Sequence, residues 1–233
     1  MLLLPLLLPA LAAALDLSVN TGRRALLLAP LAAVSPRAAH AANPVRDGMA
    51  AFAANDVEGA IELYDAAIRA SPAAKPYLWQ RGLALYYAGR FADGAEQFAA
   101  DVDVNPNDTE EQIWHLLCLA QVKGGLAAAR PFKLTVGTDR RPVMRAAQQL
   151  FLSGSAADEA RLAGLAQGGD FYASLYLSLY AESLGQAPAA EGRMLEAVAT
   201  DYARGSGRSD PMVELAKVAV VRRGWGGAAA ARR

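Results

Sequence analysis

Apolar residues recur every three or four positions along most of the chain after residue 42, and this spacing places side chains on one face of an α-helix. The clearest stretch runs from Phe171 to Leu184, where aromatic residues and leucines follow this spacing. Glycine, proline and asparagine separate such stretches, alanine is abundant, and β-branched residues are sparse. The pattern therefore predicts an all-α fold made of short antiparallel helices.

Two of the predicted helix pairs repeat one another without a gap. Four landmarks recur at one constant offset along the chain: Gly48 and Gly82, Phe52 and Tyr86, Tyr64 and Phe98, and Pro72 and Pro106. A shared offset at four positions indicates a structural repeat.

Several positions of the repeat have a mechanical reason. Glycine inside a helix is unfavourable by about 1 kcal/mol, so Gly48 and Gly82 predict a close approach of two helices. Asn55 and Gly89 stand at the expected tight turns, where a positive φ is often needed. The proline at the end of each unit would stop its second helix, because proline cannot continue the hydrogen-bond ladder.

This combination of small, aromatic and terminal proline residues resembles the tetratricopeptide repeat, most clearly in the second unit with its helix Tyr77–Tyr87. The constant offset matches the period of that repeat, which is about 34 residues. The resemblance implies antiparallel hairpins stacked as a right-handed α-solenoid, an α–α superhelix.

The layout over 43–223 resembles the NlpI-type tetratricopeptide lipoproteins and related plastid-targeted proteins. That resemblance implies an adaptor that presents substrates to proteases or hydrolases, and it allows a homodimer. No lipid-attachment cysteine stands at the expected cleavage site, so a lipid anchor is not supported.

We expect a cleavable targeting segment at 1–41, a helical repeat domain at 42–223 and a disordered tail at 224–233. The units predicted within the domain are clear repeats at 42–74 and 75–107, a degenerate repeat at 108–137, a helical segment at 140–168, a late hairpin at 170–203 and a terminal helix at 210–223. The third unit is degenerate because Leu116 stands where the first two have glycine.

The segment 1–41 resembles a targeting sequence. Met1–Leu15 is almost entirely leucine, alanine and proline, and it is too short and too rich in proline for a comfortable membrane span. Arg23 and Arg24 precede a second apolar stretch and resemble a twin-arginine signal. Ala39 and Ala41 form an A-x-A cleavage site.

Two signals in series are typical of proteins imported into the plastid thylakoid lumen, which is the predicted location. Secretion through the endoplasmic reticulum is the alternative. Cleavage after Ala41 would remove three arginines and one aspartate and leave a net charge of −2. No stable membrane span is expected in the mature chain.

The charge of the chain argues against nucleic acid as a partner. The 23 basic and 23 acidic residues cancel, so no broad electrostatic attraction to nucleic acid or anionic lipid is expected. An RNA-binding helical repeat is the alternative among binding functions.

No catalytic constellation stands out. His40 lies in the predicted leader, while His115 and the single cysteine, Cys118, lie in an apolar helix that favours packing roles. No Walker, GxSxG or HExxH motif occurs. We therefore expect no enzyme, no cofactor and no metal. The alternative is an enzyme with an unrecognised site, which a pocket lined by two or more carboxyl groups with displaced pKa values would favour.

The acidic segment 101–112 begins like a calcium-binding loop. However, Pro106 stands where glycine must make the sharp turn, and Gln112 stands where a bidentate glutamate is required. We interpret these charges as a solvated helix cap at a repeat boundary.

In the resembled family the first helix of each repeat lines a concave binding surface. Carried over onto this sequence, the candidate groove residues are Met49, Phe52, Trp79, Leu83, Tyr86, Tyr87, Ile113, Leu117 and Gln121. Tryptophan and tyrosine are common interface anchors, although packing in the core is the alternative for most of these side chains. The groove lacks a ring of lysines and arginines, so an apolar helix or an extended peptide is the expected ligand. The predicted function is that of a non-enzymatic protein-binding adaptor, scaffold or assembly factor.

Overall fold

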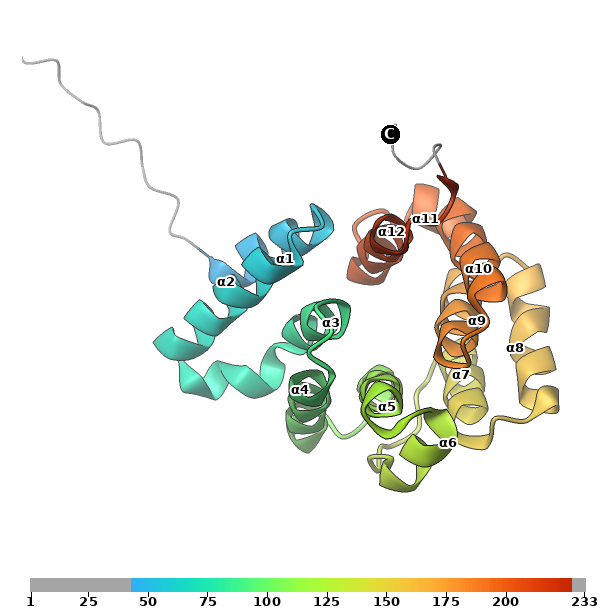
Figure 1. Ribbon diagram of the computed structural model, residues 1–233, viewed down its shortest axis with the longest axis horizontal. Helices are drawn as coiled ribbons and strands as arrows, with labels where there is room; N and C mark the ends of the chain where they lie inside the picture. Colours follow the sequence, from blue (N-terminus) through green and yellow to red (C-terminus); the bar gives the residue numbers. More distant parts are fainter. Residues whose placement is uncertain (1–42, 228–233) are drawn as a thin grey trace, which may run out of the picture. The chain divides into compact units, whose positions relative to one another are not determined.

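The computed structural model describes residues 43–227, and every regular element in that range is a helix (Figure 1). The α-helices are α1 (Pro44–Ala53), α2 (Val57–Ala70), α3 (Trp79–Tyr87), α4 (Phe91–Val104), α5 (Thr109–Lys123), α6 (Leu126–Ala129), α7 (Pro142–Ser153), α8 (Ala156–Gln167), α9 (Phe171–Ser183), α10 (Ala187–Ala199), α11 (Asp201–Arg204) and α12 (Pro211–Arg223). Two 3₁₀ helices, η1 (Pro72–Tyr77) and η2 (Arg130–Phe132), join them. The predicted leader at 1–41, with Arg23, Arg24, Ala39 and Ala41, lies outside the described residues.

The first two helix pairs turn at equivalent residues with a left-handed backbone. Asn55 has a φ of 64° between α1 and α2, and Gly89 has a φ of 76° between α3 and α4. Asn55 is the one non-glycine residue with a positive φ between 43 and 227. Asp56 then caps α2, because its Oδ1 accepts a hydrogen bond from the Gly59 amide at 3.0 Å.

The same two pairs are packed by the same glycine–aromatic contact. A Cβ built on Gly48 would lie 2.7 Å from the Tyr64 ring, and one built on Gly82 would lie 2.6 Å from the Phe98 ring. Both rings are buried. Glycine is therefore required because the aromatic ring of the second helix rests directly on the backbone of the first.

The third pair departs from this arrangement. Leu116 is fully buried where the first two pairs have glycine. Phe132, at the position equivalent to Tyr64 and Phe98, is 54% exposed, and the Lys123 ammonium lies 3.8 Å from its ring centroid. The short helices α6 and η2 stand where the first two pairs have a second long helix.

The α9–α10 pair keeps the spacing of the first pairs with different residues. Ser178 is buried, and its hydroxyl donates a 2.6 Å hydrogen bond to the carbonyl of Ala190 in the next helix. Met194 is also fully buried, and it follows Ser178 at the same sequence separation at which Phe98 follows Gly82. Serine and methionine thus take the places of glycine and the aromatic ring.

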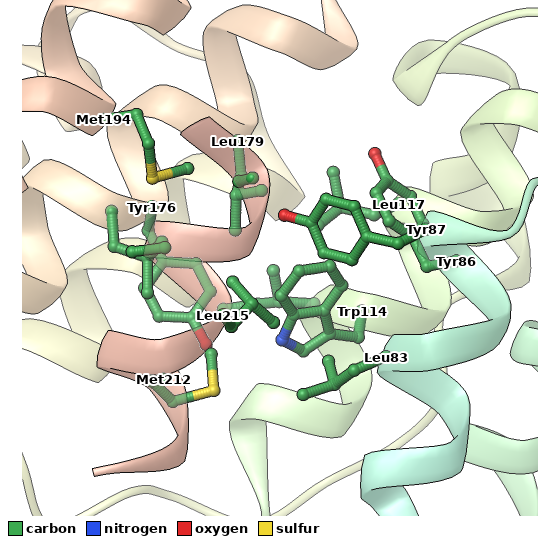
Figure 2. Packing of buried hydrophobic residues seen from close by; sticks show 14 of the residues in the cluster. Leu83, Tyr86, Tyr87, Trp114, Leu117, Tyr176, Leu179, Met194, Met212 and Leu215 are labelled. Atoms are coloured by element: carbon green, nitrogen blue, oxygen red, sulfur yellow. The ribbon is translucent and has the colours of Figure 1, made fainter. Parts of the chain in front are cut away.

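Helix α12 packs against α10 and also against α1 (Figure 1). Arg222 near its end lies 3.7 Å from Glu58 and donates a hydrogen bond to the Asn55 side chain. On the inward side of α12, Met212 and Leu215 are buried in the cluster that includes Trp114 (Figure 2). The last helix therefore contacts both the first and the last helical pairs.

Two boundaries differ from the sequence-based expectation. The first helix of the second unit begins at Trp79 rather than Tyr77, because the prolines at 72 and 76 favour a 3₁₀ segment before it. Trp225, assigned to the tail, is only 8% exposed, and the neighbouring Gly226 amide donates to Glu191. The packed domain thus extends past Gly224. None of the helices between 43 and 227 is long and apolar enough to cross a membrane.

Candidate binding site

Two adjoining cavities lie where the start of α12 meets the inner helices. One has a volume of about 220 Å³ and the other about 210 Å³. Trp79 of α3 and Pro211 of α12 line both cavities, so these two residues form a shared wall. Trp79 is itself partly exposed.

The second cavity is mainly apolar, and we call it the apolar cavity. It is lined by Met49, Ala50, Phe52, Tyr64, Trp79, Gln80, Leu83, Ser209, Pro211 and Glu214. Met49, Phe52, Trp79 and Leu83 are four of the predicted groove residues. The structure therefore brings the N-terminal part of the predicted groove to one hollow.

The other predicted groove residues line neither cavity. Tyr86, Tyr87, Ile113 and Leu117 are buried, and the rings of Tyr86 and Tyr87 meet edge to face at 5.4 Å. Gln121 is exposed on α5. Packing in the core accounts for four of these five positions.

The first cavity combines carboxyl groups with aromatic rings, and we call it the acidic cavity. Its lining comprises Trp79, Phe98, Asp108, Glu110, Glu111, Trp114, Tyr172, Asp210, Pro211 and Met212. Asp108 and Asp210 are the N-caps of α5 and α12, so the starts of two helices face this space. Helix N-termini favour negative charge, which explains why carboxylates are tolerated there.

Asp108 accepts hydrogen bonds from its neighbours, the Glu110 amide and the Asn105 side chain, whereas two other carboxyl groups accept from side chains of distant segments. Oδ1 of Asp210 accepts from the Met212 amide at 2.9 Å, and Oδ2 accepts from the hydroxyls of Tyr172 at 2.6 Å and Tyr202 at 2.7 Å. Glu110 accepts from the Tyr176 hydroxyl at 2.7 Å and from the Arg141 guanidinium at 3.0 Å. These two carboxyl groups are held in fixed positions.

Glu111 is the carboxyl group that lacks compensation. It is buried, and its Oε2 has no hydrogen-bond partner. Burial, followed by the hydrogen bond and the charge of Asp108, raises the pKa of Glu111 to about 10. Burial and the charge of Asp108 also raise the pKa of nearby Asp101 to about 6. Glu111 therefore keeps its proton at neutral pH.

Trp114 adds an unsatisfied donor to the same cavity. It lies one turn after Glu111 on the same face of α5, and its Nε1 is buried with no hydrogen-bond partner. In Figure 2 the nitrogen lies on the side of the Trp114 indole that is turned toward Met212 of α12. A buried donor and a buried acceptor without partners mark a place where a ligand can supply both.

The remaining reactive side chains are packed away from both cavities. Burial lowers the pKa of His115 to about 4 and raises the pKa of the Cys118 thiol. Cys118 lies against Gly94, where a Cβ would stand 2.9 Å from its Sγ. Among residues 43–227, no group of three histidine, cysteine, aspartate or glutamate side chains is arranged to hold a metal ion.

No protein-family model matches this chain, and no curated protein is detectably similar to it. The assignment of a function therefore depends on the geometry of the two cavities.

The acidic residues of this site are not among the residues predicted from the sequence to bind a ligand. Asp108, Glu111 and Trp114 stand at every third position, which places them on one helical face. That spacing is the available signal, but the same residues also fit a helix cap at a repeat boundary. Tyr172 and Asp210 come from distant segments, and no local pattern links them to α5.

Proposed function

We propose that this chain is a non-enzymatic, protein-binding adaptor of the tetratricopeptide type that binds its partner at the two adjoining cavities. One observation carries the proposal: an apolar cavity and an acidic cavity share Trp79 and Pro211 as a wall. A single extended segment can therefore place an apolar side chain in one and a polar side chain in the other.

The repeat assignment is supported by the packing of the first two pairs. Gly48 and Gly82 bear on the rings of Tyr64 and Phe98 in the same way, at the constant offset that the sequence shows. Because α12 packs against α1 and buries Leu215 in the core, the accessible part of the inner surface lies near the start of α12. The proposed binding surface is therefore smaller than a full concave groove.

An enzyme is the second candidate, and one observation favours it. Glu110 and Glu111 line one cavity, and burial raises the pKa of both. However, Glu110 is engaged by Tyr176 and Arg141, and no serine, cysteine, histidine or lysine lines the cavity. Turnover of ester, glycoside or peptide substrates that is lost in Glu111→Gln would establish the enzyme instead.

The proposed location, the thylakoid lumen, depends on the leader alone. Fusing residues 1–41 to a fluorescent reporter tests it, and substitution of Arg23 and Arg24 by lysine is the matched control for the twin-arginine signal. Lumenal fluorescence that requires the arginine pair supports this location. Fluorescence outside the cell would support secretion.

Site-specific photo-crosslinking tests the binding proposal. A photoreactive amino acid replaces Met49 or Trp79, which line the cavities and are partly exposed, or Val122, an exposed residue of α5 that lines neither. We expect the same protein adduct from positions 49 and 79 and none from 122. Adducts that do not depend on the position would contradict the proposal.

A further inference from the structure

We propose that the acidic cavity binds a basic side chain, arginine or lysine, of the partner protein, while a neighbouring apolar residue of that partner fills the apolar cavity. This inference rests on the proposed function and names the chemistry of the partner. It combines the charge of the cavity, its unpartnered buried groups and its aromatic walls.

The charge of the cavity favours a cation. Four carboxyl groups line it, with Asp101 close behind. Among the ion pairs of the described residues, Arg141 with Glu110 at 3.0 Å is the one that involves a lining carboxyl group. Arg141 also pairs with Asp139 at 2.8 Å, so its charge is shared. A second cation would compensate Asp108, which has no basic partner in residues 43–227, and its donors could also reach the unpartnered oxygen of Glu111.

The aromatic rings suit the same ligand. Trp79, Trp114 and Tyr172 line the cavity, and cations are attracted to the faces of such rings. One contact of this kind already lies at the cavity, because the Arg141 guanidinium is 5.6 Å from the ring centroid of Tyr172, a lining residue. A planar guanidinium can lie against a ring while it donates to carboxylates at its edge.

The buried indole nitrogen indicates a peptide rather than a free cation. Trp114 Nε1 is a donor and needs an acceptor, which a cation cannot provide. A peptide carries a carbonyl oxygen beside each basic side chain and can satisfy Trp114 and Glu111 together. The apolar cavity beyond Trp79 and Pro211 then receives an adjacent apolar side chain.

The indole signals of the full-length protein provide a direct test. The chain has three tryptophans, of which Trp79 and Trp114 line the acidic cavity and Trp225 lines neither cavity. The probe is the blocked dipeptide acetyl-Leu-Arg-amide, titrated while ¹H–¹⁵N spectra record the three indole resonances. We expect saturable shifts at Trp79 and Trp114 with a Kd on the order of 1 mM or tighter, and no shift at Trp225.

Two controls isolate the charge. Acetyl-Leu-citrulline-amide has the same shape without the charge and should bind at least about tenfold more weakly. Asp108→Asn should weaken the arginine probe by a similar factor, since asparagine keeps the cap of α5 without the charge, whereas Glu96→Gln, an exposed carboxylate of α4, should leave it unchanged. Affinity should also fall as the pH is lowered from about 7.5 to about 5, because Asp101 behind the cavity has a pKa of about 6 and loses its negative charge over this range.

Equal binding of the arginine and citrulline probes, or no response at Trp114, would overturn the inference. If crosslinks from positions 49 and 79 still form in that case, the proposed function stands and only the basic ligand is wrong. If the probe binds as expected but no crosslinks form, the site exists and the adaptor function is wrong.

Discussion

The hydroxyl of Tyr172 donates a 2.6 Å hydrogen bond to Oδ2 of Asp210. This bond ties the first turn of α9 to the N-cap of α12, and the other oxygen of Asp210 accepts from the Met212 amide. The contact therefore orders one wall of the acidic cavity and the beginning of the helix that closes it. Removing this hydrogen bond should loosen both the cavity wall and the first turn of α12.

Tyr172→Phe should lower the free energy of unfolding by about 1 kcal/mol, because a partly buried hydrogen bond is lost without a change of shape. The same substitution should accelerate amide hydrogen exchange in the first turn of α12. Tyr202→Phe is the matched control, since the Tyr202 hydroxyl donates to the same oxygen from a more exposed position. Denaturant unfolding and hydrogen exchange provide the measurements. An equal loss in both variants would mean that Tyr172 has no special part in anchoring α12.

Gly82→Ala should destabilise the domain by about 1–3 kcal/mol, because the new methyl group would stand 2.6 Å from the buried Phe98 ring. Gly192→Ala in α10 is the matched control. Gly192 lies inside a helix with nothing within 4 Å of its added Cβ, so alanine should stabilise by about 0.5–1 kcal/mol. Thermal and urea unfolding measure both changes. If the two substitutions shift stability in the same direction, the proposed close packing at Gly82 is incorrect.

Local patterns account for the part of the fold that the sequence could predict. The turns at Asn55 and Gly89 require a left-handed backbone that asparagine and glycine adopt readily, so the residue types and the constant offset were enough to locate them. The glycine–aromatic contacts follow from the same offset. The α9–α10 pair was located by its apolar stripe, but its shared spacing was hidden because serine and methionine replace the usual residues.

Long-range contacts account for the part that could not be predicted. The position of α12 against α1 depends on pairs such as Arg222 with Glu58, which come from opposite ends of the described chain. This position determines which candidate groove residues remain accessible. Trp79 stays at a cavity wall, whereas Tyr87 is buried, with the Arg223 guanidinium 5.3 Å from its ring centroid. Periodicity alone cannot distinguish these two outcomes.

Arg223→Met should destabilise the domain by about 1–3 kcal/mol, because it removes the cation that pairs with the largely buried Glu182 carboxylate. The other oxygen of Glu182 already lacks a partner, so the remaining charge would be poorly solvated. The double variant with Glu182→Gln should recover part of the loss. A double-mutant cycle by urea unfolding measures the coupling between the two residues. Strictly additive losses would show that the ion pair does not hold α12 to α9.

Glu111→Gln should become more stabilising, relative to the unchanged protein, as the pH rises. The pKa of Glu111 is about 10 in the folded protein against 4.5 when unperturbed, so between these values the folded chain keeps a proton that the unfolded chain has lost. Stability from this group is therefore present at about pH 4.5 and is lost as the pH rises toward 10. Glutamine stays neutral, and its advantage should reach about 1 kcal/mol or more near pH 8.

Asp101→Asn is the comparison, because the pKa of Asp101 is about 6 and its effect should be complete by about pH 7. Urea unfolding of both variants from about pH 5 to 9 separates the two profiles, and a constant difference for Glu111→Gln would show that this carboxyl group is ionised throughout.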